Sequence, residues 1–218
     1  RYSDVEEYGS IQEGLDFLKK LPIQFNITNE FFSDFDNLSS DTRQTIIMAY
    51  ALKNNFNTYL CGNNSLCIKK ESLEDNILLE KFNSKTKFTK DTIKVYIDDY
   101  GVYTISSSKS STYYKVSLDS DNTNYRKYSK FSHYKEDKDM YIFYLYEGYY
   151  NGNCKKGEEL SLYDFITGKV VYTDKCNGNN EFSIDPSESI KDLQLYKYEL
   201  KRDENNKYYL KGYNPVSK

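Results

Sequence analysis

The segment Met140-Tyr-Ile-Phe-Tyr-Leu-Tyr146 is an unbroken apolar and aromatic run without glycine or proline. Both of its faces are apolar, which predicts a central strand that is covered on both sides. Two segments follow, Leu160–Asp164 and Lys169–Thr173, around the turn residues Thr167 and Gly168, and they predict a hairpin. We expect the rest of the chain to pack onto these strands.

Five more segments after residue 90 have the alternation or the aromatic content of strands. They are Ile93–Ile97, Val102–Ser106, Tyr113–Leu118, Leu193–Leu200 and Lys207–Tyr213. The last two are separated by the turn-forming residues Asp203–Asn206, which predicts a closing hairpin. Residues 119–138 are polar throughout and predict a long excursion over the surface.

The first ninety residues carry helical periodicity instead. Four helices are predicted, with Ser10, Thr28, Ser40 and Ser72 at or near their first residues. Helices before residue 90 and strands after it predict an α+β fold, with an N-terminal helical half packed on a C-terminal antiparallel β-sheet. Residues 1–9 are predicted to be a lead-in or linker. Residues 10–218 are predicted to form one domain, with a possible subdivision into 10–90 and 91–218.

The four cysteines allow three pairings, and the local one is favoured. Turn residues separate Cys61 from Cys67, and Cys154 and Cys176 flank the predicted hairpin at its base, so each pair can approach bonding distance. Free thiols and a four-thiolate zinc site are the alternatives, although five and twenty-one intervening residues exceed the usual zinc spacing. Disulfides predict an extracellular location, secreted or anchored at the cell surface. The chain begins at Arg1 instead of Met, and we expect a signal peptide or anchor upstream.

The residue patterns that several classes of function require are not found in the sequence. The net charge is −3 and the lysines alternate with acids, which disfavours nucleic acid as a partner. No apolar stretch approaches the roughly 20 residues of a membrane span. A single histidine, His133, is predicted to lie in a solvated loop, and it permits no two-histidine metal site. Asp119–Thr123 begins like a calcium loop, but Asn124 and Lys130 replace its glycine and glutamate. No cofactor and no metal are therefore predicted.

The chain contains 24 tyrosines and no tryptophan. An AT-rich genome explains this composition, and a tyrosine-rich binding face is the alternative. Along the central strand, Phe143 and Leu145 are predicted to be buried against the helical half, and the flanking Glu147 is expected to reach water. The predicted ligand-binding residues are Tyr144, Tyr146, Tyr149 and Tyr150, and the alternative is that all four belong to the ordinary core.

The C-terminal segment Tyr196–Tyr213 consists of the strand Tyr196-Lys-Tyr-Glu-Leu-Lys201, an acidic and asparagine-rich turn, and the strand Tyr208-Tyr-Leu210. This ending resembles that of uncharacterised secreted or membrane-anchored ectodomains of AT-rich Gram-positive bacteria. The helical stretch 38–53 is similar in position too. The resemblance implies an exported bacterial ectodomain without an assigned activity, and it implies no functional residues.

Together these features predict a cell-surface domain of unknown function that acts as a non-enzymatic binding or interaction module for a protein or a glycan. The alternative is an extracellular hydrolase, similar to a glycosidase, with a carboxylate-based site. Two carboxyl groups about 5 to 9.5 Å apart in a cleft would favour the hydrolase. A flat patch of tyrosines and no cleft would favour the binding module.

Overall fold

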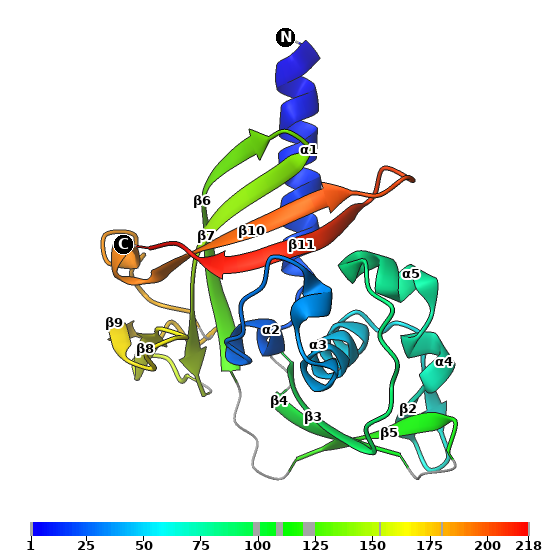
Figure 1. Cartoon of the computed structure of the whole chain (residues 1–218). Helices are drawn as coiled ribbons and strands as arrows, with labels where there is room; N and C mark the ends of the chain where they lie inside the picture. Colours follow the sequence, from blue (N-terminus) through cyan, green and yellow to red (C-terminus); the bar gives the residue numbers. More distant parts are fainter. Residues whose placement is uncertain are drawn as a thin grey trace.

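The computed structural model describes residues 2–97, 101–107, 111–119, 125–152, 154–179 and 181–217. These residues form two antiparallel sheets, and the helices α2 and α3 lie between them (Figure 1). The long helix α1 crosses behind one of the two sheets in this view. The fold therefore has a layer of helices enclosed by strands.

The larger sheet, called sheet A, is built around the predicted central strand. Its strands are β6 (Tyr125–Asp137), β7 (Met140–Asn151), β8 (Glu159–Tyr163), β9 (Val170–Lys175), β10 (Gln194–Arg202) and β11 (Tyr208–Pro215). Their order is β11-β10-β7-β8-β9, and β6 pairs with β7 along its whole length. The predictions of a central strand and of the two hairpins around it are confirmed.

The smaller sheet, called sheet B, contains two strands that the sequence analysis missed. Its strands are β1 (Thr58–Cys61), β2 (Ser65–Lys69), β3 (Thr92–Ile97), β4 (Gly101–Ser106) and β5 (Tyr113–Leu118), in the order β1-β2-β5-β4-β3. The predicted strands β3, β4 and β5 are confirmed. The first pair was missed because each strand is short and the turn between them was interpreted only as a disulfide loop.

The helices differ from their predicted positions. They are α1 (Tyr2–Lys19), α2 (Ile23–Ile27), α3 (Ser40–Lys53), α4 (Lys70–Leu73) and α5 (Asn76–Leu79), with 3-10 turns η1 (Phe35–Asn37), η2 (Glu80–Phe82) and η3 (Ile190–Asp192). Ser10 lies inside α1, and Thr28 ends α2 instead of starting a helix. The third helix is confirmed with a shift of one residue in its cap, because the Ser39 hydroxyl accepts from the Thr42 amide at 3.2 Å.

The predicted fold class, a helical N-terminal half packed on a C-terminal sheet, is wrong. The first ninety residues contribute β1 and β2, and residues 119–138, predicted as a surface excursion, contribute the long strand β6. Strands predominate among the described residues and form two sheets, and the helices other than α1 and α3 are short. The helices are enclosed because each sheet offers one apolar face, and a layer between them covers both.

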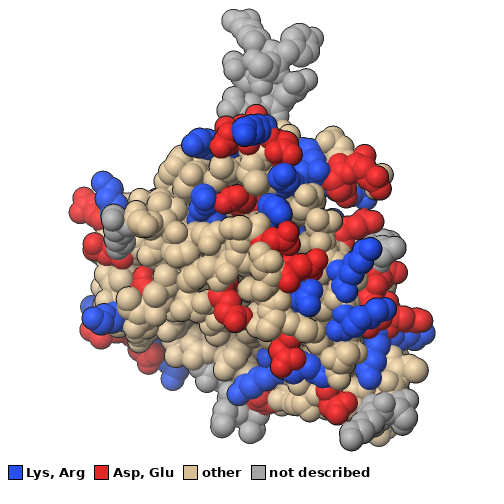
Figure 2. Space-filling view, in the orientation of Figure 1, with Lys and Arg blue, Asp and Glu red and all other residues tan. Residues whose placement is uncertain are grey.

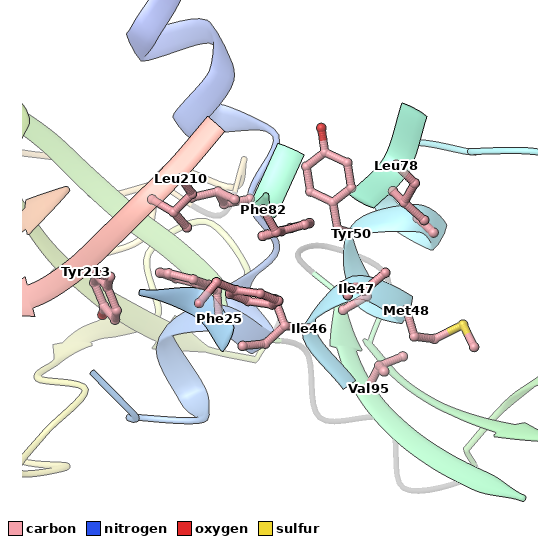
Figure 3. Close-up of a cluster of buried hydrophobic side chains, with 14 of the residues drawn as sticks. Phe25, Ile46, Ile47, Met48, Tyr50, Leu78, Phe82, Val95, Leu210 and Tyr213 are labelled. Atoms are coloured by element: carbon pink, nitrogen blue, oxygen red, sulfur yellow. The ribbon is translucent and has the colours of Figure 1, made fainter. Parts of the chain in front are cut away.

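The helix layer explains why α3 is apolar on several sides. Five consecutive residues of α3, Ile46 to Tyr50, are all buried. Figure 3 shows Leu210 and Tyr213 of β11 on one side of this cluster and Val95 of β3 on the other. A helix that is buried all round packs on both neighbours, as α3 does here.

Both predicted disulfides are present. Cys61 pairs with Cys67 across β1 and β2, with their Cα atoms 5.9 Å apart. Cys154 pairs with Cys176 at the base of the β8–β9 hairpin, with a Cα separation of 5.8 Å. All four cysteines are thus bonded, which excludes the free-thiol and zinc alternatives. In the described part of the chain, no helix combines the length and apolar character needed to cross a membrane.

Candidate functional site

A buried polar cluster lies on the inner face of sheet A, the face that covers the helices. Lys127 of β6, Glu147 of β7, Tyr198 of β10 and Tyr213 of β11 come from four neighbouring strands. Glu147 shares the inner face with Phe143 and Leu145 because alternate residues of a strand point the same way. The short helix α2 adds Asn26 from above the sheet.

The carboxylate of Glu147 is almost completely buried, with 1% of its surface exposed. Its Oε2 atom lies 2.9 Å from Nζ of Lys127. Its Oε1 atom accepts hydrogen bonds from the Tyr198 hydroxyl and, at 3.4 Å, from Nδ2 of Asn26. A carboxylate can remain charged at such depth because it is both paired and hydrogen-bonded.

The tyrosine hydroxyls of this cluster are held in their protonated form. Burial, and then the negative charge of Glu147, raise the pKa of Tyr198 well above its usual range. Burial is also the first cause that raises the pKa of Tyr213. Asn26 donates to the Tyr213 hydroxyl at 3.0 Å, whereas Asn26 Oδ1 and the Tyr196 hydroxyl are buried without a hydrogen-bond partner among the described residues.

Next to the cluster is a cavity of about 370 Å³, called the ion-pair cavity, between α1, the end of α3 and sheet A. This volume lies within the usual range for small-ligand sites. Its apolar walls are Leu15, Leu18, Leu21, Phe131 and Leu145. Its polar lining consists of Lys19, Lys53, Lys127, Ser129, Glu147 and Tyr198.

The polar lining of the ion-pair cavity has an excess of positive charge. Three lysines face one carboxylate, and that carboxylate is already bonded to Lys127. Lys53 also donates from Nζ to the carbonyl oxygen of Leu21 at 3.0 Å. On the molecular face in Figure 2, by comparison, lysines and arginines are interspersed with acids. A mixed lining of leucines and ammonium groups is suited to a ligand with an apolar body and an anionic group.

The predicted site residues do not meet at this cavity. Tyr144, Tyr146 and Tyr150 share the outer face of β7, whereas Tyr149 points to the inner face. Tyr144 stacks on His133 with ring centroids 4.1 Å apart, and Tyr146 and Tyr150 pack on a small cluster that includes Leu193. All four tyrosines are half-buried. Their role in ligand binding stays a prediction.

Phe143 and Leu145 are buried as predicted, with exposed fractions of 0% and 6%. Two other residues differ from the predictions. His133 lies on strand β6 and not in a loop. Glu147 was expected to reach water, and the structure buries it, because β7 continues past it to Asn151. The sequence did contain a signal for this burial: Glu147 follows Phe143 and Leu145 at intervals of two, which places all three on the same face of the strand.

Lys127 and Asn26 were missed for different reasons. Lys127 lies in the stretch that was interpreted as a surface excursion, so its pairing with Glu147 had no basis in the sequence. Asn26 belongs to α2, a helix too short for periodicity to indicate. Residues 120–124 of the possible calcium loop Asp119–Lys130 fall outside the described residues, and among those described no group of acids, histidines or cysteines is arranged to hold a metal ion.

A carboxylate pair of the glycosidase type is not found at the ion-pair cavity. Of the described residues that line it, Glu147 alone carries a carboxyl group. No protein-family model, curated protein or solved structure matches the chain. Function therefore has to be inferred from the chemistry of the site.

Proposed function

We propose that the chain is a non-enzymatic binding module that works outside the cell. The ion-pair cavity is its ligand site, and the ligand is a small molecule with an apolar body and one anionic group. The observation that supports this most directly is the cavity's lining of three lysines and five apolar side chains around a carboxylate that is already paired.

Binding is favoured over catalysis by the state of Glu147. Both of its oxygens are engaged, one by Lys127 and the other by Tyr198 and Asn26, so neither is free to take a proton from a substrate. General acid–base catalysis on a sugar would also require a second carboxyl group. The raised pKa of Tyr198 keeps its hydroxyl a hydrogen-bond donor instead of a base.

An extracellular location is supported by the two disulfides, because such bonds persist in oxidising compartments. A protein or glycan partner at the cell surface stays a prediction. The half-buried tyrosines of the outer face, Tyr144, Tyr146 and Tyr150, offer it a contact surface, since tyrosine contributes area at low entropic cost.

The proposed ligand class can be tested with decanoate and its uncharged analogue decanol. We expect decanoate to bind about tenfold more tightly, since even one ammonium–carboxylate contact in a partly buried cavity exceeds about 1.4 kcal/mol. Isothermal titration calorimetry on the disulfide-bonded protein measures both affinities. Equal affinities for the two compounds would show that the lysines do not select the ligand.

The location of the site is tested by filling the cavity. Ser129 lines it from an exposed strand position, so Ser129→Trp is expected to fold and to abolish decanoate binding. Ser117→Trp, at an exposed position of β5 in the other sheet, is the matched control and should bind as the parent does. The natural chain contains no tryptophan, so the fluorescence of the added indole reports whether it is buried in the cavity. Unchanged binding by Ser129→Trp would refute the assignment.

A further inference from the structure

A second hollow lies where the two sheets meet, and aromatic rings line it. Tyr96 comes from β3 of sheet B, Tyr125 and Tyr149 come from β6 and β7 of sheet A, and Phe165 comes from the turn between β8 and β9. Helix α2 holds the sheets together here, because Gln24 Oε1 accepts from the Tyr96 amide at 2.8 Å. The space enclosed is about 130 Å³, and we call it the aromatic hollow.

The rings of the aromatic hollow are inclined to one another and do not form a flat stack. Tyr125 and Tyr149 are at 79° with centroids 5.4 Å apart, and Tyr96 and Tyr125 are at 54° and 5.6 Å. Phe165 is tilted by 37° from Tyr149 at 5.0 Å. One face of Tyr149 stacks on Tyr163, and Ile27 of α2 completes the lining. A hollow that is lined mainly by aromatic rings from several strands is suited to a cation.

A buried carboxylate makes this region more negative. Asp164, next to Phe165, has 7% of its surface exposed, and its Oδ1 accepts from the amides of Ile166 and Thr167, both at 2.8 Å. No lysine or arginine of the described residues forms a salt bridge with it. Burial is the first cause that raises the pKa of Tyr149, followed by Tyr125 and Tyr163, and the charge of Asp164 is the last.

The chain's own Lys94 reaches only the rim. Its Nζ lies 6.0 Å from the centroid of the Tyr96 ring, and its side chain is exposed to water. A primary ammonium is strongly hydrated and is costly to enclose. An alkylated ammonium has apolar methyl groups around the same charge, so rings can replace its water at a smaller cost.

We propose that the aromatic hollow binds a quaternary ammonium group, as in choline or a choline-bearing headgroup. This site is separate from the ion-pair cavity, because none of its lining residues is shared with that cavity. The aromatic hollow would bind a cationic group, whereas the ion-pair cavity would bind an anionic one. The chain would then hold two ligand groups of different chemistry on sheet A and at its junction with sheet B.

The test compares choline with 3,3-dimethylbutanol, its neutral carbon isostere, by NMR of the tyrosine rings. We expect choline to bind about tenfold more tightly, because the two differ in charge and hardly in shape. Tyr149→Leu should weaken choline binding by a similar factor. Tyr144→Leu is the matched control, since it removes a half-buried tyrosine from the opposite face of the same strand, and it should leave choline binding unchanged.

Two results would overturn the proposal. One is equal binding of choline and its isostere, which would make the hollow merely apolar. The other is an equal loss of choline binding in Tyr144→Leu and Tyr149→Leu. If Tyr149→Leu does not fold, Phe165→Leu replaces it, because Phe165 lines the same hollow from the turn between β8 and β9. Choline binding should also survive in Ser129→Trp, which fills only the ion-pair cavity.

The source of the ammonium group is decided by vesicles of phosphatidylcholine and of phosphatidylglycerol. Sedimentation of the protein with the first and not the second supports a lipid headgroup as the ligand. Binding of free choline without sedimentation supports a soluble or polymer-borne ammonium group. Sedimentation with phosphatidylglycerol alone, without choline binding, contradicts the proposal.

Discussion

At the scale of single residues, two glycines of α1 show how closely this helix approaches sheet A. A Cβ atom at Gly14 would overlap the ring of Phe143, which is fully buried at the centre of β7. A Cβ atom at Gly9 would meet nothing within 4 Å. Gly14 is thus present because α1 and β7 pack in direct contact at this point.

We expect Gly14→Ala to lower the free energy of unfolding by about 1 to 3 kcal/mol, because the added methyl group overlaps the fully buried ring of Phe143. Urea unfolding followed by circular dichroism measures the change.

Gly9→Ala is the matched control in the same helix. Alanine favours helix over glycine, so this variant should gain up to about 1 kcal/mol. If both variants gained stability, the helix would not lie against Phe143 as described.

Glu147 shows what the sequence could and could not indicate at this scale. The alternation along β7 placed Phe143 and Leu145 in the core correctly, and the same rule places Glu147 with them. It was assigned to water because a glutamate is seldom buried without a partner. The partner, Lys127, lies on a strand that the sequence analysis did not predict, so the pair could not be inferred.

At the scale of elements, strands with one or two apolar faces were predictable and exposed strands were not. β7 and β3 carry the apolar runs or alternation that burial requires, and both were found. β6 was missed because nearly all of its side chains are exposed or half-exposed, as expected of a strand that pairs along one edge only. The hydrogen bonds that hold β6 in the sheet are made by its backbone, so they do not require a pattern of apolar side chains that the sequence could show.

The one-residue offset in β6 leads to a prediction about register. Phe131 pairs with Leu145 and His133 pairs with Tyr144, so Ser132 is an extra residue in a β-bulge. Deleting Ser132 leaves every other pair of β6 and β7 in place. We expect this deletion to change the free energy of unfolding by no more than about 1 kcal/mol.

Deleting Lys130, two positions away, is the control. The bulge can absorb this loss as well, but Phe131 then pairs with Tyr146 and turns to the outer face, while Ser132 takes its place opposite Leu145. Lys127 stays beside Glu147, and the variant loses the Phe131 ring from the inner face, so we expect a loss of about 1 to 2 kcal/mol. Urea unfolding midpoints compare the two deletions. Equal losses would show that the bulge is required for the twist of the sheet.

At the scale of the whole molecule, the tyrosines bind the layers together. Tyr198 and Tyr213 of sheet A pack on Phe25 of α2, and Tyr50 of α3 packs on Phe82 of η2. Tyr114 of sheet B packs on Phe88 and donates from its hydroxyl to the carbonyl oxygen of Lys90 at 2.7 Å. The tyrosine-rich composition, which the sequence analysis attributed to an AT-rich genome, therefore also serves the core, where the buried tyrosines are Tyr50, Tyr114, Tyr196, Tyr198, Tyr208 and Tyr213.

This use of tyrosine makes the fold sensitive to alkali. Burial raises the pKa of Tyr50 to about 12, and burial is the first cause that raises the pKa of Tyr114 to about 12. In the unfolded chain both ionise near pH 10, so above that pH the unfolded state binds fewer protons than the folded one. Their stabilising contribution is complete below about pH 10 and is lost as the pH rises toward 12.

We therefore expect the free energy of unfolding to fall steeply above about pH 10. The free energy of unfolding of Tyr50→Phe should fall less steeply than that of the parent. Urea unfolding at a series of pH values measures both slopes. Lysines lose their charge in the same range, so only the difference between variants isolates the tyrosine. Tyr113→Phe, which removes an exposed hydroxyl, should keep the slope of the parent. If Tyr50→Phe also kept that slope, Tyr50 would ionise alike in the folded and unfolded chains, and its burial in the helix layer would be wrong.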